Sequence, residues 1–339
     1  MPVLESTSRI MTNSRMPLRS LGSTGLLTSG LGLGLAALGR PAYINLGRRE
    51  DFGSQRTVAD LERRCHDVLD AAYAAGIRYV DAARSYGIAE AFLGSWLNDR
   101  NPPRDAITIG SKWGYTYVGS WRLDAVVHEV KDLSVETLRK QVAESRALLG
   151  DRLQLYQIHS ATVESGVLDD PDVLRELQQL RSQGLAIGLT VSGPGQGDTI
   201  RRALQVNADG RNLFQVVEAT WNLLETSAGA ALADAKAQGW GIIIKEALAN
   251  GRLTDRNQGE PLTNLKKEAY AQDTTIDALA LAAALSQPWA DVVLSGAATV
   301  EQLESNVKSI GLVREATDWT VVAEPPAEYW ARRSALVWQ

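Results

Sequence analysis

The chain repeats one unit along most of its length, in which a short apolar run, a loop, a helical pattern and a glycine follow one another. Strands that alternate with helices are typical of a parallel sheet, whose strands are buried on both faces and read as continuous apolar runs. A count of eight runs favours a single closed (β/α)8 barrel of the TIM type over an open doubly wound sheet. The runs are Leu31–Ala36, Arg78–Ala82, Ala106–Trp113, Leu153–His159, Ala186–Val191, Phe214–Ala219, Gly241–Lys245 and Asp291–Leu294.

Helical patterns lie between most of these runs. In the first pattern, apolar residues recur at the spacing that places them on one face of a helix. Asp170 suits the N-cap of a helix and Pro171 its first turn. We expect helices at about Val58–Ala75, Val135–Leu149, Pro171–Gln183, Thr199–Gln205, Ser227–Gln238, Ile276–Leu285 and Val300–Ile310.

The two ends of the chain depart from this repeat. Residues 1–15 are polar and without a sustained period, so we interpret them as an N-terminal tail that could be disordered. The stretch Leu18–Leu27 has glycines at turn positions and predicts a short hairpin. No Gly-, Ser- or Pro-rich linker divides residues 16–339, which we expect to form one barrel domain. Its aromatic C-terminal extension, Glu324–Gln339, is expected to fold back over the barrel.

Composition excludes several classes of protein. The 339 residues carry 35 Lys and Arg against 40 Asp and Glu, and a formal charge of −5 argues against a general nucleic-acid binder. The apolar run Ala278–Leu285 is far shorter than the roughly 20 residues that a membrane span needs. The single cysteine, Cys65, makes neither an internal disulfide nor a cysteine zinc site. With no leader pattern at the start, we expect a cytoplasmic protein without a nucleic-acid or membrane partner.

Ionisable residues close three successive apolar runs in the first half of the chain. Asp81 lies near the end of the second run, and Tyr86 follows in the loop after it. Lys112 lies near the end of the third run, and His159 is the last residue of the fourth. The carboxyl ends of barrel strands meet on one rim, where the chemistry of such barrels is assembled. A single polar residue at a strand end is common, but four at matching positions predict a shared catalytic site.

These four side chains suit an acid–base reaction. A phenol with a pKa near 10 donates a proton poorly at neutral pH unless a nearby ammonium lowers that pKa. Lys112 can supply this charge to Tyr86, Asp81 can pair with Lys112, and His159 can orient a carbonyl oxygen by hydrogen bonding. The pattern offers no nucleophile and no metal site, so a hydride for reducing a carbonyl or oxidising an alcohol has to come from a cofactor.

From Met16 to about Asn306 the sequence resembles the aldo-keto reductase superfamily. The resemblance implies a (β/α)8 barrel that binds a nicotinamide cofactor in extended form without a Rossmann fold. It also implies that the four residues above are the family's catalytic tetrad, with Tyr86 as general acid and base. It rests on D-A-A-R-S-Y-G at Asp81–Gly87, S-K-W-G at Ser111–Gly114, L-Y-Q-I-H-S at Leu155–Ser160 and G-A-A-T-V-E-Q-L-E-S-N at Gly296–Asn306.

Three of the cofactor contacts implied by the resemblance depart from the family pattern. Thr190 stands where the family usually has Ser, and the following Val191 cannot replace the amide of the usual Asn. Glu218 stands in place of the usual Gln. Lys245 stands in place of the aromatic residue that stacks on the nicotinamide.

The other expected cofactor contacts lie at the first strand end, in the loop that resembles the family's pyrophosphate loop, and in the motif that grips the adenosine end. The first strand carries a G-x-G-x-x-A pattern, but Pro41 precludes the helix that a dinucleotide fingerprint needs. Its glycines instead allow close approach of the backbone to a ligand. The motif at 296–299 lacks the cation that many members carry for a 2′-phosphate, so NAD(H) stays possible while NADP(H) is slightly favoured. These contacts are Gly34, Leu35, Leu248, Asn250, Gly251, Gly296, Gln302 and Asn306.

Aromatic residues at or beyond the strand ends are candidates for lining an apolar substrate pocket. We expect a small aldehyde, ketone or sugar as substrate, with its identity and the direction of the reaction open, as is the oligomeric state. Two other functions remain open: a regulatory, cofactor-sensing subunit of an ion channel, as some relatives are, and a lyase that forms a Schiff base on Lys245. The pocket candidates are Tyr43, Trp113, Tyr115, Trp121 and Trp221.

Overall fold

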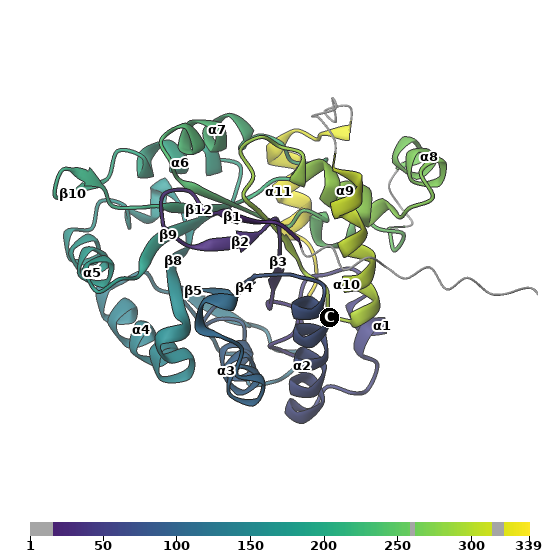
Figure 1. Ribbon diagram of the computed structural model, residues 1–339, viewed down its shortest axis with the longest axis horizontal. Helices are drawn as coiled ribbons and strands as arrows, with labels where there is room; N and C mark the ends of the chain where they lie inside the picture. The colour runs from purple at the N-terminus through teal and green to yellow at the C-terminus, as the bar shows by residue number, and fades with distance from the viewer. Residues whose placement is uncertain (1–15, 258–261, 314–321) are drawn as a thin grey trace, which may run out of the picture.

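A computed structural model describes residues 16–257, 262–313 and 322–339, so the expected tail at 1–15 lies outside the described residues. Eight parallel strands close into a barrel with helices around the outside (Figure 1), which confirms the predicted fold. Going round the barrel, each strand neighbours the next one along the chain. The strands are β3 (Leu31–Gly34), β4 (Tyr79–Asp81), β5 (Thr108–Trp113), β8 (Leu153–Ala161), β9 (Ala186–Val191), β12 (Val216–Thr220), β13 (Gly241–Lys245) and β14 (Val292–Ser295).

The expected helices are present, with bounds within three residues of those that the sequence predicts. Helix α2 begins where the Thr57 side chain accepts a hydrogen bond from the backbone N–H of Asp60, and α5 begins at Pro171 after the Asp170 cap. The helices are α1 (Arg48–Phe52), α2 (Val58–Ala74), α3 (Ala89–Arg100), α4 (Val135–Leu149), α5 (Pro171–Ser182), α6 (Gln196–Ala203), α7 (Gly229–Ala237), α8 (Thr263–Ala271), α9 (Ile276–Leu285), α10 (Val300–Val307) and α11 (Pro326–Ser334).

Helix α3 was not predicted from the sequence. It buries a carboxylate, because Glu90 accepts hydrogen bonds from the Ser111 and Ser145 hydroxyls at 2.6 and 2.7 Å and pairs with Arg84 at 2.5 Å. Gly94 of the same helix lies where a Cβ would come within 2.6 Å of the Leu148 carbonyl oxygen. A buried charge and a buried glycine interrupt the apolar stripe by which a surface helix is recognised.

Antiparallel hairpins and single turns of 3-10 helix complete the described chain. Helix α9 is buried along its whole length, which accounts for the longest apolar run of the sequence. No helix of the described residues is long and apolar enough to cross a membrane. The hairpins pair β1 (Leu18–Ser20) with β2 (Leu27–Ser29), β6 (Tyr115–Tyr117) with β7 (Glu129–Lys131), and β10 (Asn207–Ala208) with β11 (Arg211–Asn212). The 3-10 turns are Arg104–Ala106, Gly150–Arg152, Val163–Ser165, Ala249–Gly251 and Lys308–Leu312.

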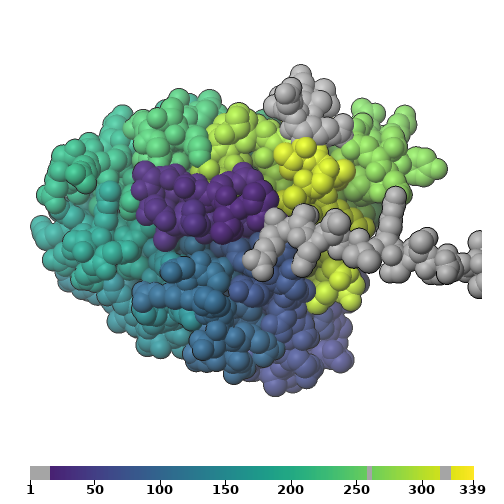
Figure 2. Space-filling view, viewed as in Figure 1, coloured from purple at the N-terminus to yellow at the C-terminus, as the bar shows by residue number. Residues whose placement is uncertain are grey.

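The N-terminal hairpin closes the amino-terminal end of the barrel. It lies across the middle of the face shown in Figure 2, in purple. Leu21 in its turn is fully buried and packs with residues at the start of several strands, among them Val216 and Ala186. Gly22 has φ 52°, and a Cβ there would lie 2.2 Å from the Gly241 backbone nitrogen, so this close approach requires glycine.

Strand register brings the carboxyl ends of β4, β5 and β8 side by side on the opposite rim. Asp81 at the end of β4 pairs with Gly110 of β5, and Lys112 of β5 pairs with Gln157 of β8. Because parallel strands in neighbouring positions end at the same level, the polar residues that follow them face one another across the mouth of the barrel.

We predict that Leu21→Ala destabilises the protein by about 3 kcal/mol, since it removes a wholly buried side chain and leaves a cavity at the closed end of the barrel. Urea unfolding followed by tryptophan fluorescence measures the change. Leu18→Ala is the control on the same hairpin, because that side chain is 51% exposed and its loss should change stability by no more than about 0.5 kcal/mol. Equal losses in the two variants would contradict the role assigned to Leu21.

Candidate active site

The buried ammonium of Lys112 joins the candidate catalytic residues. Its Nζ forms an ion pair with Asp81 and lies 3.4 Å from the hydroxyl of Tyr86. A second carboxylate, that of Glu218 on β12, lies 3.3 Å from the same nitrogen and accepts a hydrogen bond from Gln157 at 3.1 Å. The structure thus brings together the residues that the sequence placed at strand ends. It also adds Glu218 as a second carboxylate beside the Lys112 ammonium.

Burial and charge set the protonation states of this cluster. Burial opposes the charge on Lys112, but Asp81 and Glu218 outweigh it and raise the pKa of the ammonium above its ordinary value. Burial, with the charge of Glu218, raises the pKa of Asp81, against the effect of Lys112. Burial also raises the pKa of Tyr86 well above 10, and Lys112 acts against that rise. Tyr86 is therefore a neutral phenol at pH 7, next to a permanent positive charge.

His159 completes the cluster as a neutral side chain. Burial, followed by the charges of Lys112 and Lys245, lowers its pKa well below 6.5. Its Nδ1 lies 3.4 Å from the Ser85 hydroxyl, and its ring packs edge-on against Tyr86, with the centroids 5.6 Å apart. A neutral imidazole held in this way can donate one hydrogen bond to an oxygen in the cavity.

A cavity of about 820 Å³ extends from this cluster to helix α10. Nine of the expected cofactor contacts line it: Gly34, Glu218, Lys245, Leu248, Asn250, Gly251, Gly296, Gln302 and Asn306. Two of the expected contacts do not. Leu35 is fully buried, and its backbone N–H donates a hydrogen bond to the Asp81 carbonyl oxygen at 2.9 Å. The Thr190 hydroxyl accepts a hydrogen bond from the backbone N–H of Ser160 at 2.8 Å.

The substrate end of the cavity contains only two of the five aromatic residues expected there, Tyr43 and Tyr115. Trp113 is fully buried. Neighbouring side chains of a strand point to opposite faces, and Lys112 points into the barrel. The side chain of Trp113 therefore points outward, toward the helices. Trp121 donates its indole N–H to the Arg56 carbonyl oxygen at 2.8 Å, and Trp221 packs against Trp289. The structure does not bring these three tryptophans to the cavity.

Arg40 was missed by the sequence reasoning and lies at the centre of the substrate end. Its guanidinium lies 5.3 Å from the ring centroid of Tyr86, 4.8 Å from that of Tyr43 and 4.7 Å from that of Trp338. It also donates to the Ser85 carbonyl oxygen at 2.9 Å and pairs with Glu129. Apart from Tyr43, these contacts come from three distant segments, so no local motif could have revealed them.

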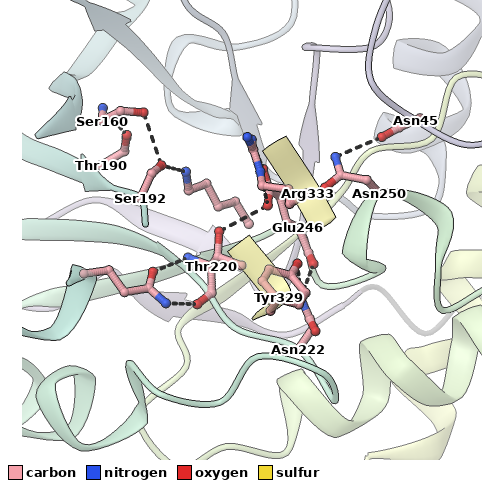
Figure 3. A network of polar contacts seen from close by, with 12 residues as sticks. Asn45, Ser160, Thr190, Ser192, Thr220, Asn222, Glu246, Asn250, Tyr329 and Arg333 are labelled. Carbon is pink, nitrogen blue, oxygen red and sulfur yellow. Dashed lines mark hydrogen bonds and ion pairs between the residues drawn. The ribbon is translucent and has the colours of Figure 1, made fainter. Parts of the chain in front are cut away.

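The C-terminal segment forms part of the cavity wall. Arg333 of α11 makes a two-pronged ion pair with Glu246, which follows β13 (Figure 3), with its closest contact at 2.6 Å. The Tyr329 hydroxyl accepts a hydrogen bond from Asn222 at 3.0 Å. At the last residue, the backbone groups of Gln339 and Tyr43 exchange two hydrogen bonds of 3.1 Å. The aromatic extension is thereby fixed at the mouth of the barrel.

The far end of the cavity is acidic. Asp51 of α1 pairs with Arg256 and accepts a hydrogen bond from Gln302 of α10 at 2.8 Å. Asp277 and Glu301 also line this end. The loop before α1 lies across the 249–251 turn, where Leu46 N–H donates to the Asn250 carbonyl oxygen at 3.0 Å and the two side chains of Asn45 and Asn250 meet, as Figure 3 shows. No group of His, Cys, Asp and Glu in the described chain is arranged to hold a metal ion.

Comparison with known proteins identifies the family. A profile of the Aldo/keto reductase family matches residues 31–324, and the chain therefore belongs to that family. Since several of its relatives are named oxidoreductases, the chain is an NAD(P)-dependent oxidoreductase.

The relatives span nearly the whole chain. It is 25% identical to the NADH-specific methylglyoxal reductase of Escherichia coli, over 90% of this chain and 96% of that protein. It is 30% identical to the D-threo-aldose 1-dehydrogenase of a Pseudomonas species, over 84% of this chain and 87% of that protein. An aldo-keto reductase from Bacillus halodurans, solved in its holo form, shares the fold with a TM-score of 0.68 at 21% identity, over 94% and 96% of the two chains.

We predict that Glu246→Gln destabilises the protein by about 2–4 kcal/mol at pH 7, because it leaves Arg333 without its partner. Burial opposes the charge on Glu246, but Arg333 outweighs it and lowers the pKa of the carboxyl below 4.5. The contribution of the pair is thus complete above about pH 4.5 and is lost as the pH falls through the pKa of the folded state. Urea unfolding of wild type and variant should show a difference in stability that narrows as the pH is lowered below about 4.5.

Asp124→Asn is the control, since Asp124 is 78% exposed and pairs with Arg122, which is 65% exposed. Such exposed pairs contribute little to stability. A difference for Glu246→Gln that stays constant down to the lowest pH would contradict the ion pair as its cause.

Proposed function

We propose that the protein interconverts a small carbonyl compound and its alcohol, with Tyr86 as general acid and base. The observation that carries this is the Tyr86 hydroxyl, 3.4 Å from the Lys112 ammonium and beside neutral His159 in one cavity. A nicotinamide cofactor, when bound, supplies or accepts the hydride at the carbonyl carbon.

Residues along the cavity fit such a cofactor. The buried Asn250 Oδ1 has no hydrogen-bond partner among the described residues and can accept a bond from a ribose hydroxyl. Ser160, Glu246 and Asn250 line the cavity with φ of 54°, 54° and 56°, a strained conformation for these residues that is common at ligand sites. At Gly296, space is open where a Cβ would stand. We propose that the cofactor lies along this row, from Lys245 and Glu218 to Gln302 and Asn306.

The chain's own residues move the proton. In reduction, the Tyr86 hydroxyl donates its proton to the carbonyl oxygen, and the Lys112 ammonium stabilises the phenolate that remains. Asp81 and Glu218 hold that ammonium in place from two sides. His159 donates a hydrogen bond to the same oxygen and orients it. In oxidation, the phenolate takes the proton from the alcohol, and the other groups keep their roles.

The substrate that we propose is a small aldehyde, a ketone or a sugar at its anomeric carbon. The relatives named for methylglyoxal and for C1 of D-threo-aldoses support these classes. The cavity supports them too, because Tyr43, Tyr115 and Trp338 give it aromatic walls and Lys131 and Arg333 give it polar ones.

Replacing Tyr86 by Phe should lower the turnover of any accepted carbonyl substrate by about 10²–10⁴-fold, because the proton donor is lost while the ring and its packing remain. Steady-state cofactor oxidation at 340 nm measures turnover, and a fluorescence titration shows whether the cofactor still binds. Tyr115→Phe is the matched control: its ring also packs on His159, with the centroids 5.0 Å apart, but its hydroxyl is not bonded to Lys112. Near-native turnover in Tyr86→Phe would overturn the mechanism.

For the cofactor we propose NAD(H), although the family resemblance slightly favoured NADP(H). Asp51, Asp277 and Glu301 line the end of the cavity that would hold the adenosine. Of the arginines there, Arg256 is paired with Asp51, and Arg48 is fully buried with its guanidinium 3.7 Å from the ring centroid of Phe52. A 2′-phosphate would lie near the carboxylates of Asp277 and Glu301, whereas a 2′-hydroxyl can donate a hydrogen bond to a carboxylate.

NADH should accordingly bind at least about tenfold more tightly than NADPH, because like charges placed together cost binding free energy. Titration of tryptophan fluorescence with each cofactor measures both affinities. The double variant Asp277→Asn with Glu301→Gln should bind NADPH more tightly than wild type does. Glu304→Gln is the control, since Glu304 lies on α10 but does not line the cavity. Tighter binding of NADPH by wild type would refute the proposal.

A further inference from the structure

Lys245 brings a second ammonium to the cavity, which the proposed proton transfer does not use. It ends β13 and lines the cavity, and its Nζ donates to the Ser192 hydroxyl at 2.8 Å. That hydroxyl lies 3.2 Å from the hydroxyl of Ser160, the residue after His159, and Figure 3 shows the two serines pointing toward one another. The lysine is therefore held at a defined place close to the catalytic cluster.

The charge of Lys245 is not cancelled by an ion pair with any described residue. The two carboxylates that act most on the pKa of Lys245 are those of Glu246 and Glu218, and each forms an ion pair with another residue. Glu246 forms its ion pair with Arg333, and Glu218 lies against Lys112 and Gln157. Burial, together with the positive charges of Arg333 and Lys112, lowers the pKa of Lys245, as expected for a cation that lacks a partner of its own.

The reacting end of the cofactor has to lie close to this ammonium. Hydride transfer requires the nicotinamide C4 and the carbonyl carbon to be about 3–3.5 Å apart. In the proposed reaction the carbonyl oxygen is bound by Tyr86 and His159, and Ser192 and Lys245 line the same cavity. Two serine hydroxyls connect the Lys245 ammonium to Ser160, the residue that follows His159 in the chain.

We propose that Lys245 makes the protein bind the reduced cofactor in preference to the oxidised one. The oxidised nicotinamide ring carries a positive charge, which the reduced ring lacks, so the ammonium repels only the oxidised form. The inference rests on the proposed function and adds to it the preferred direction of the reaction. A protein that holds the reduced cofactor and releases the oxidised one is suited to carbonyl reduction.

The test compares the affinities of the full-length protein for NADH and NAD⁺. Isothermal titration calorimetry gives the two dissociation constants for wild type, Lys245→Met and Lys245→Arg. In Lys245→Met the ratio of the NAD⁺ constant to the NADH constant should fall about tenfold, a size expected for two like charges a few ångströms apart in a partly shielded site. Most of the change should be tighter binding of NAD⁺. Lys245→Arg keeps the charge and should keep most of the wild-type ratio.

Lys140→Met is the control for the loss of one positive charge. Lys140 lies on α4, is exposed to solvent and does not line the cavity. Its loss should leave the ratio unchanged, and an equal fall there would overturn the assignment to Lys245. An unchanged ratio in Lys245→Met, with both cofactors bound, would also overturn it. If wild type bound neither cofactor, the proposed function itself would fail. Circular dichroism shows whether each variant is folded.

Discussion

The buried ammonium of Lys112 is the constraint on which the site depends. It pairs with Asp81 of one strand and Glu218 of another inside the barrel. Because a buried charge is costly unless it is paired, both carboxylates are needed to stabilise the ammonium in this position. The Ala82 carbonyl oxygen and the Tyr86 hydroxyl also lie beside the ammonium, each at 3.4 Å. The groups that hold the charge in the core of the fold thus also place the phenol at the floor of the cavity.

The cavity combines opposite electrical environments along its length. Lys112, Lys245 and Arg40 lie around the candidate catalytic residues, where burial and then these positive charges lower the pKa of His159. Carboxylates predominate at the far end, near α10. A single extended molecule lying in the cavity would experience both. In the two proposals above, positive charge acts on the oxidation state of the nicotinamide and negative charge acts on the ribose substituent.

Most of the fold, and the meeting of Asp81, Tyr86, Lys112 and His159 on one rim, could be predicted because both follow from local order. Apolar runs mark buried strands, and polar residues at their carboxyl ends meet on one rim once the barrel closes. The remaining features depend on contacts between distant segments. Buried Glu90 interrupts the apolar pattern by which helix α3 would be recognised. Trp113 lies on the outer face of its strand, and the guanidinium of Arg40 contacts residues as far along the chain as Trp338.

The position of Arg40 has a consequence for how such a protein can change its substrate. The same guanidinium contacts Tyr43 and Trp338 in the substrate wall and the ring of Tyr86. Remodelling that wall would therefore disturb the surroundings of Tyr86, the proposed proton donor, so substrate recognition and reactivity would change together. In the hairpin of β6 and β7, variation at residues other than Tyr115 and Glu129, which contact His159 and Arg40, would disturb these groups less.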